Sequence, residues 1–144
     1  MFARFQTGIA LAVLLSLMGF EYARAQEMAH AVEAGTFHGK VHKTSGRATI
    51  YKEADGRLVL RLTSFKTSNG PDVHVVLIAA RDADDDANFL KNSTAKLELG
   101  ALKGNEGDQN YDIPAGTDLD KFQTVSIYCE RFNANFGAAP LKKL

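Results

Sequence analysis

The chain has 144 residues, of which 45% are hydrophobic and 24% are charged, and its 17 basic and 17 acidic side chains balance to a net charge of zero. This length suits a single domain with a modest core, since domains usually hold about 100–200 residues. The balanced charge argues against nucleic acid or an anionic membrane surface as a partner, because a basic excess supplies most of the affinity for both.

Residues 1–25 are predicted to be a secretory signal peptide. Arg4 is the only charge before an apolar run over residues 8–20, which is too short to cross a bilayer because a spanning helix needs about 20 residues. The small-x-small sequence Ala-Arg-Ala over residues 23–25 follows as a cleavage site. The alternative, an uncleaved amphipathic anchor, is disfavoured because the apolar run has no polar stripe. Cleavage before Gln26 predicts an exported protein, periplasmic or secreted.

The chain after the cleavage site is predicted to be soluble and nearly neutral. It holds no second apolar run of that length, so no transmembrane segment is expected there. Arg4, Glu21 and Arg24 precede the site, which leaves the mature chain at a net charge of −1. Its one cysteine, Cys129, cannot form an internal disulfide, so the fold must be held by packing alone.

Short strands are predicted from the first half of the mature chain. Residues 26–34 are mixed in character and are expected to be a flexible lead-in to a domain over residues 35–141. Residues 36–42 alternate in polarity, as a half-buried strand does. Residues 47–53 and 58–65 alternate on either side of Asp55-Gly56, a pair that favours a type I′ hairpin turn because both residues tolerate a positive φ.

The second half of the mature chain continues the pattern. Residues 73–80 are almost all apolar and β-branched, as in a strand buried on both faces. The polar insert that follows carries an acidic run over residues 84–86, which is expected to be a solvated loop because the spacing of a calcium loop is absent. Further strands are predicted over residues 95–99, 109–113 and 122–131, with a candidate edge strand over 132–139. Short strands separated by Gly, Asn and Asp predict an all-β sandwich or barrel.

Three ordered segments carry longer motifs. They read FKTSNGPDVHV over residues 65–75, LKGNEGDQNYDIP over 102–114 and VSIYCERFNANFGAA over 125–139. They resemble, in the same order, three motifs of the DM-thirteen (electron-transfer DM) domain family, which read F-T-S-N-G-P-D-L-x-V, L-K-G-N-x-G-x-Q-N-Y-x-I-P and V-x-I-W-C-x-x-F-x-x-x-F-G-x-A. One departure is Tyr128, where many members carry Trp.

The resemblance spans nearly the whole mature chain and implies a fold and a function. The fold is a single antiparallel β-sandwich of short strands, related to DOMON-type domains. The function is a part in extracytoplasmic redox reactions, in which the cysteine acts as a thiol or ligates a prosthetic group such as haem.

Cys129 is the first candidate site residue, and two interpretations of it stay open. It shares the apolar face of its predicted strand with Val125 and Ile127, which favours a buried small hydrophobe. A reactive thiol prefers basic, partly exposed surroundings, and Arg131 follows two residues later. The resemblance favours this second interpretation, in which Cys129 is a redox thiol or a ligand.

His74 is the second candidate, because it interrupts the buried strand over residues 73–80. It is predicted to be an inward polar group, either a core histidine with satisfied hydrogen bonds or a cofactor-binding residue that ligates haem or copper. His38 and His42 lie on one predicted face about 13 Å apart, too far to share a metal ion. No metal site is predicted from these spacings, and the cofactor stays open with haem as a candidate.

Five turn formers complete the candidate residues: Asn69, Asp72, Gly104, Asn105 and Gly107. They are predicted chiefly to build turns. They also qualify to rim a shared site, because loops on a rigid sandwich carry function.

Two functions are consistent with this sequence. The first is an exported redox or electron-transfer accessory module in which Cys129 is the functional thiol or ligand. The second is a non-catalytic extracytoplasmic binding or structural β-sandwich in which Cys129 belongs to the core. Neither G-x-S-x-G nor H-E-x-x-H occurs, so the sequence offers no hydrolase signature.

Overall fold

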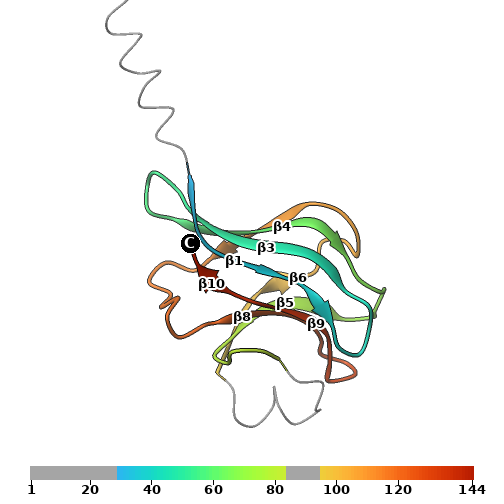
Figure 1. Ribbon diagram of the computed structural model, residues 1–144. Coiled ribbons are helices and arrows are strands. Elements are labelled where there is room, and N and C mark those ends of the chain that lie inside the picture. The colour runs from blue at the N-terminus through green and yellow to red at the C-terminus, as the bar shows by residue number, and fades with distance from the viewer. Residues whose placement is uncertain (1–28, 84–94) are drawn as a thin grey trace, which may run out of the picture.

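The computed structural model describes residues 29–83 and 95–144 (Figure 1). These residues form strands and no helix, so none of them belongs to a helix able to cross a membrane. The predicted signal peptide and the acidic run over residues 84–86 lie outside the described residues. Two antiparallel five-stranded sheets pack against each other, which confirms the predicted all-β sandwich.

The first sheet has the strand order β10-β1-β3-β4-β7. These strands are β10 (Lys142–Lys143), β1 (His30–Thr36), β3 (Ser45–Lys52), β4 (Leu58–Lys66) and β7 (Gln109–Ile113). The two ends of the described chain therefore meet, since β1 lies between β3 and the C-terminal β10 (Figure 1).

The second sheet has the strand order β2-β9-β8-β5-β6. These strands are β2 (His38–Gly39), β9 (Ala134–Pro140), β8 (Thr124–Cys129), β5 (Val73–Ile78) and β6 (Lys96–Ala101). The tail predicted as an edge strand is thus the inner strand β9, bonded to β8 on one side and to β2 on the other. The strand predicted over residues 36–42 is reduced to the two residues of β2.

The main core lies between the two sheets. Ile50, Leu60 and Leu62 from the first sheet and Leu77 and Ile127 from the second are fully buried there. Each such side chain stabilises the fold by about 1.5–3 kcal/mol relative to an exposed one. This packing accounts for a sandwich that holds together without a disulfide.

The outer face of the second sheet carries a smaller core of its own. Val76 and Ile78 from β5 pack there with Tyr128 from β8, Ala138 from β9 and Ala83. Strand β5 is therefore buried on both faces, as its run of apolar residues predicts.

The predicted flexible lead-in over residues 26–34 is wrong from residue 30 onward. Strand β1 begins at His30 and pairs with both β3 and β10. Val32 packs against the main core, and Ala34 and Glu33 are each only 6% exposed. Such an Ala- and Glu-containing stretch has weak intrinsic strand preference, so pairing with two neighbouring strands makes it a strand.

The predicted hairpin is confirmed, but its turn is of another type. Strands β3 and β4 pair in register from Lys52↔Leu58. Gly56 donates its N–H to the carbonyl of Glu53 at 2.9 Å, and Gly56 alone among residues 54–56 has a positive φ, +87°. This pattern is a type I turn followed by a left-handed glycine in a bulge, whereas a type I′ turn needs two positive φ values.

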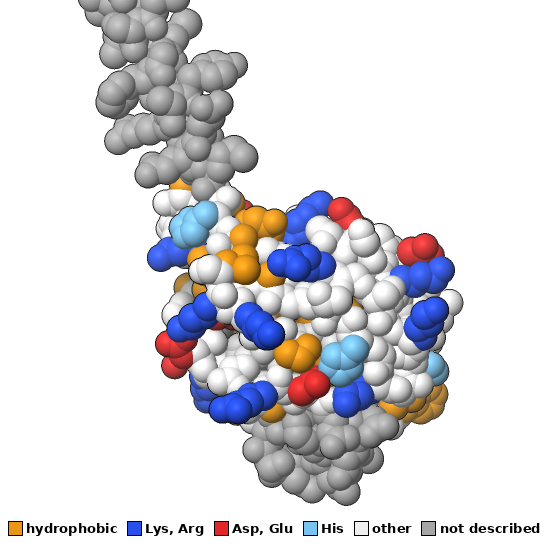
Figure 2. Space-filling model, viewed as in Figure 1, with side chains coloured by type: hydrophobic (Ala, Val, Ile, Leu, Met, Phe, Trp, Pro, Cys, Tyr) orange, Lys and Arg blue, Asp and Glu red, His pale blue; other side chains and the backbone are white. Residues whose placement is uncertain are grey.

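The surface in view mixes both charge signs. Figure 2 shows Lys and Arg side chains spread over this face of the sandwich rather than gathered in one patch. Exposed large hydrophobic side chains among the described residues are Val41, Phe132 and Leu144.

Candidate functional site

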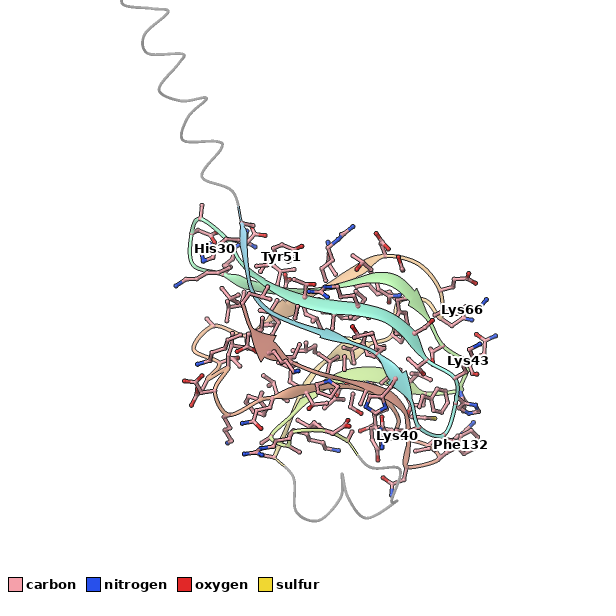
Figure 3. All side chains as sticks on the ribbon, viewed as in Figure 1. His30, Lys40, Lys43, Tyr51, Lys66 and Phe132 are labelled. Carbon is pink, nitrogen blue, oxygen red and sulfur yellow. The ribbon has the colours of Figure 1, made fainter. Side chains whose placement is uncertain are left out.

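The three motif segments meet at one end of the sandwich. Figure 3 places Lys66, at the end of β4, and Phe132, after β8, at the end opposite His30. The β4–β5 loop and the β6–β7 loop are joined there by main-chain hydrogen bonds. Thr67 donates to the carbonyl of Asn105 at 2.8 Å, and Leu102 donates to that of Val73 at 2.8 Å.

These two loops form a groove of about 330 Å³, which we call the motif groove. It is lined by Ser68, Asn69, Gly70, Pro71, Asp72, Val73, Ala101, Leu102, Gly104 and Asn105. Four of the five turn formers predicted to rim a shared site therefore line one groove. The fifth, Gly107, instead donates its N–H to the carbonyl of Phe65 at 2.8 Å and fastens the β6–β7 loop to β4.

The β6–β7 loop is held by its own side chains. The Tyr111 hydroxyl accepts a hydrogen bond from the Lys103 N–H at 2.9 Å and donates one to Gln109 Oε1 at 2.6 Å. Gln109 Nε2 in turn donates to the Gly104 carbonyl at 2.9 Å. The Q-N-Y part of the second motif thus fixes the backbone that lines the groove.

Gly70 brings the β4–β5 loop directly onto the core. A Cβ atom at this position would lie 2.6 Å from Val73 Cγ2 and 2.9 Å from Phe136 Cζ. Neither distance is compatible with a side chain without displacing the core. The N-G-P turn therefore needs glycine because of close packing, and it seals this end of the sandwich.

Cys129 is the last residue of β8 and faces the main core. It is fully buried in the same cluster as Val125 and Ile127, which confirms that it shares their face. In the β5–β8 register it stands opposite Val73. Because Val73 also lines the motif groove, this one side chain links the groove to the thiol.

His74 faces the other way, so the prediction of an inward polar group is wrong. The residues before and after it, Val73 and Val75, belong to the main core, whereas its own side chain lies among carboxylates on the outer side of the second sheet. His74 Nε2 lies 2.7 Å from Asp72 Oδ1, and Nδ1 is hydrogen-bonded to Glu98 Oε1. The imidazole is 16% exposed.

The neighbouring carboxylates raise the pKa of His74. Partial burial lowers the pKa of His74, but the hydrogen bonds and charges of Asp72 and Glu98 together outweigh burial and hold that pKa above its usual value. Glu130 Oε2 adds a third carboxylate, 3.9 Å from Nε2. The imidazole thus lies in a strongly negative environment.

The structure does not bring His74 and Cys129 together. They occupy opposite faces of the second sheet, and Arg131 lies exposed beyond the end of β8. A haem held by both Cys129 and His74 does not fit this arrangement, because the two side chains point to opposite faces of one sheet. Among the described residues no buried side-chain polar atom lacks a hydrogen-bond partner. We therefore derive no chemistry through haem.

Glu98 and Glu130 are the residues that sequence reasoning missed as neighbours of His74. Glu98 lies on β6 and Glu130 follows β8, and both strands flank β5. Alternation along a strand indicates which residues share a face. It carries no information about which strands are neighbours, so these contacts have no signal in the sequence.

A comparison with known protein families identifies the family to which the chain belongs. Residues 36–141 match the family model described as Electron transfer DM13. No curated protein and no solved structure matches the chain. The family match covers all three motif segments and most of the sequence, and it confirms the resemblance that those motifs carry. The chain therefore belongs to the electron-transfer DM13 family.

Proposed function

We propose that this protein is an exported electron-transfer accessory module whose functional group is the Cys129 thiol. The observation that carries the proposal is the convergence of the three motifs. Two of them build the motif groove, and the third places Cys129 opposite Val73, which lines that groove. The family description, electron transfer, is consistent with a thiol at this position.

The single cysteine limits the chemistry that this site can perform. Cys129 has no second cysteine in the chain, so a disulfide at this position needs the sulfur of another molecule. Its thiolate would attack a partner's disulfide, form a mixed disulfide and release the partner's other sulfur as a thiolate. The proposed approach to the sulfur is from the motif groove, because Val73 lines that groove and stands opposite Cys129 in the register.

Equilibration with glutathione buffers tests this proposal. The native exported protein is incubated at a series of ratios of glutathione to glutathione disulfide, quenched with acid, and weighed by mass spectrometry. We expect one glutathione to be added at Cys129, with a midpoint that differs from that of the same chain in denaturant. The Cys129→Ala variant is the control and should gain none.

The alternative function, a non-catalytic binding or structural sandwich, has its own supporting observation. Cys129 is fully buried in the largest core cluster, as free cysteine often is when it acts as a small hydrophobe. If glutathione adds only when the chain is unfolded, the redox proposal fails and this alternative stands. In that case Cys129→Ser should cost about 1–3 kcal/mol for a buried hydroxyl without a partner.

Export is a separate part of the proposal with its own test. Secreted in a bacterial host, the chain should lose residues 1–25 and start at Gln26, as intact mass would show. Ala23→Asp places a charge at the small-residue cleavage site and should leave the longer form. Arg24→Gln changes the variable middle position and should not. A wild-type mass that still includes residues 8–20 would contradict cleavage.

A further inference from the structure

One imidazole and two carboxylates converge on the outer side of the second sheet. The ligand atoms of Asp72, His74 and Glu130 all lie within 4.8 Å of one another. His74 Nε2 is 2.7 Å from Asp72 Oδ1 and 3.9 Å from Glu130 Oε2. Ligands held at about 2.1 Å around a tetrahedral zinc ion lie about 3.4 Å apart, so small side-chain movements would bring these three atoms to such spacing.

The other ring nitrogen of His74 has a partner of the kind found in metal sites. Nδ1 is hydrogen-bonded to Glu98 Oε1. A histidine that binds a metal through one nitrogen usually donates its other N–H to a carboxylate or carbonyl, which fixes the tautomer and orients the ring. With Nδ1 donating to Glu98, Nε2 points at Asp72 and Glu130, and a metal ion bound there would replace the proton that Nε2 now donates to Asp72. This arrangement separates the cluster from a simple group of surface acids.

The backbone holds these residues in place. His74 lies within β5, and its register partner on β8 is Tyr128, two residues before Glu130. The Glu130 N–H donates to the Asp72 carbonyl at 3.0 Å, which joins the two carboxylate-bearing residues directly. Glu98 lies on β6, the neighbour of β5 on the other side. His74 and Glu98 are carried by paired strands, and Asp72 and Glu130 directly adjoin strand ends, so the backbone of the site needs little ordering on binding.

We propose that Asp72, His74 and Glu130 bind a divalent first-row transition-metal ion, with Glu98 as the positioning residue for the imidazole. Imidazole with carboxylates suits Zn²⁺ and its neighbours, whereas Mg²⁺ and Ca²⁺ prefer oxygen ligands alone. Three carboxylates surround one imidazole here, so a dication would offset their excess negative charge. Water completes the coordination.

This site is independent of the proposed thiol function. Cys129 faces the main core and His74 the outer side of the same sheet. Metal binding should therefore survive Cys129→Ala, and its failure would leave the glutathione result unchanged. The two proposals can be refuted separately.

Calorimetric titration of the exported protein with ZnCl₂ tests the site. We expect one saturable Zn²⁺ per chain, lost or strongly weakened in His74→Gln and in Glu130→Gln. Glu98→Gln should weaken binding by about 10–100-fold, the usual effect of removing a partner of a ligating histidine. An NMR spectrum of the imidazoles should show Zn²⁺ at Nε2 of His74. Excess Ca²⁺ or Mg²⁺ should not displace the ion.

The matched control is the other histidine–carboxylate pair of the described chain. His38 Nε2 lies 2.8 Å from Asp82 Oδ1, and within residues 29–83 and 95–144 no second carboxylate forms an ion pair with it. His38→Gln should leave the affinity unchanged. Circular dichroism verifies the fold of each variant, and the half-exposed Glu98 provides a test if His74→Gln does not fold. Unchanged affinity in the folded His74 or Glu98 variant, displacement by Ca²⁺, or no saturable binding would overturn the proposal.

Discussion

At the scale of single residues, Val73 lies between the Cys129 thiol and the solvent in the motif groove. It is 9% exposed, lines the motif groove and stands opposite Cys129, which is fully buried. Gly70 of the β4–β5 loop packs so closely against Val73 that a Cβ atom at position 70 would lie 2.6 Å from Val73 Cγ2. A reagent that approaches the sulfur from the motif groove therefore has Val73 in its path.

Shortening Val73 should therefore expose the thiol selectively. In Val73→Ala, we expect the native protein to react with a thiol reagent several-fold faster than the wild type, because two methyl groups beside the sulfur are removed. Val75→Ala is the matched control. It removes the same two methyl groups from the same strand face at a fully buried position, opposite Ile127 rather than Cys129. Equal rates in both variants would indicate that the reagent reacts through global unfolding instead.

The contrast between Cys129 and His74 shows how far residue-level prediction reaches. The apolar face that Cys129 shares with Val125 and Ile127 was predictable from alternation along β8, and it is buried in the main core. His74 lies on β5, where Val75 and Val76 are both buried although they face opposite sides. When both faces of a strand are apolar, alternation does not distinguish the inner from the outer one, so the direction of His74 could not be derived.

At the scale of elements, the β3–β4 hairpin depends on one left-handed residue. Gly56 has φ +87°, and a Cβ atom there would meet no other atom within 4 Å. The cost of a side chain at this position is therefore the backbone conformation alone. Asp55 supports the turn by accepting a hydrogen bond from the Arg57 N–H at 3.0 Å.

Gly56→Val should destabilise the protein by about 1–3 kcal/mol, the cost of holding a β-branched residue at positive φ. Gly56→Asn should cost less, because Asn tolerates the left-handed region. Urea denaturation of both variants measures the difference. If the two variants lose the same stability, side-chain contacts rather than φ govern this turn.

The strands differ in how well the sequence predicts them, for a physical reason. Strands β4, β5, β7 and β8 are rich in Val, Ile, Leu and Tyr and were predicted nearly in place, since apolar side chains mark a half-buried or fully buried strand. Strand β1 has Ala and Glu at its two most buried positions. Its partners are β3 and the distant β10, and such pairing has no local signal.

At the scale of the whole molecule, the first and last strands of the described residues, β1 and β10, complete the first sheet. The family match covers residues 36–141, so it leaves out nearly all of β1 and the whole of β10. These two strands pair with each other, and the Leu144 N–H donates to the Val32 carbonyl at 3.0 Å. Without them, β3 loses one of its two neighbours and becomes an edge of the sheet.

A chain limited to residues 36–141 should therefore be much less stable than residues 26–144. The truncation removes the β1–β3 pairing from His30 to Gly35 and uncovers the core under Val32 and Ala34. Domains have about 5–15 kcal/mol of stability in total, so loss of a paired strand removes a large share of it. A chain of residues 29–144 is the control and should match 26–144, because β1 starts at His30. The urea midpoints of the three chains measure the effect, and equal midpoints would mean that β1 and β10 add nothing to the fold.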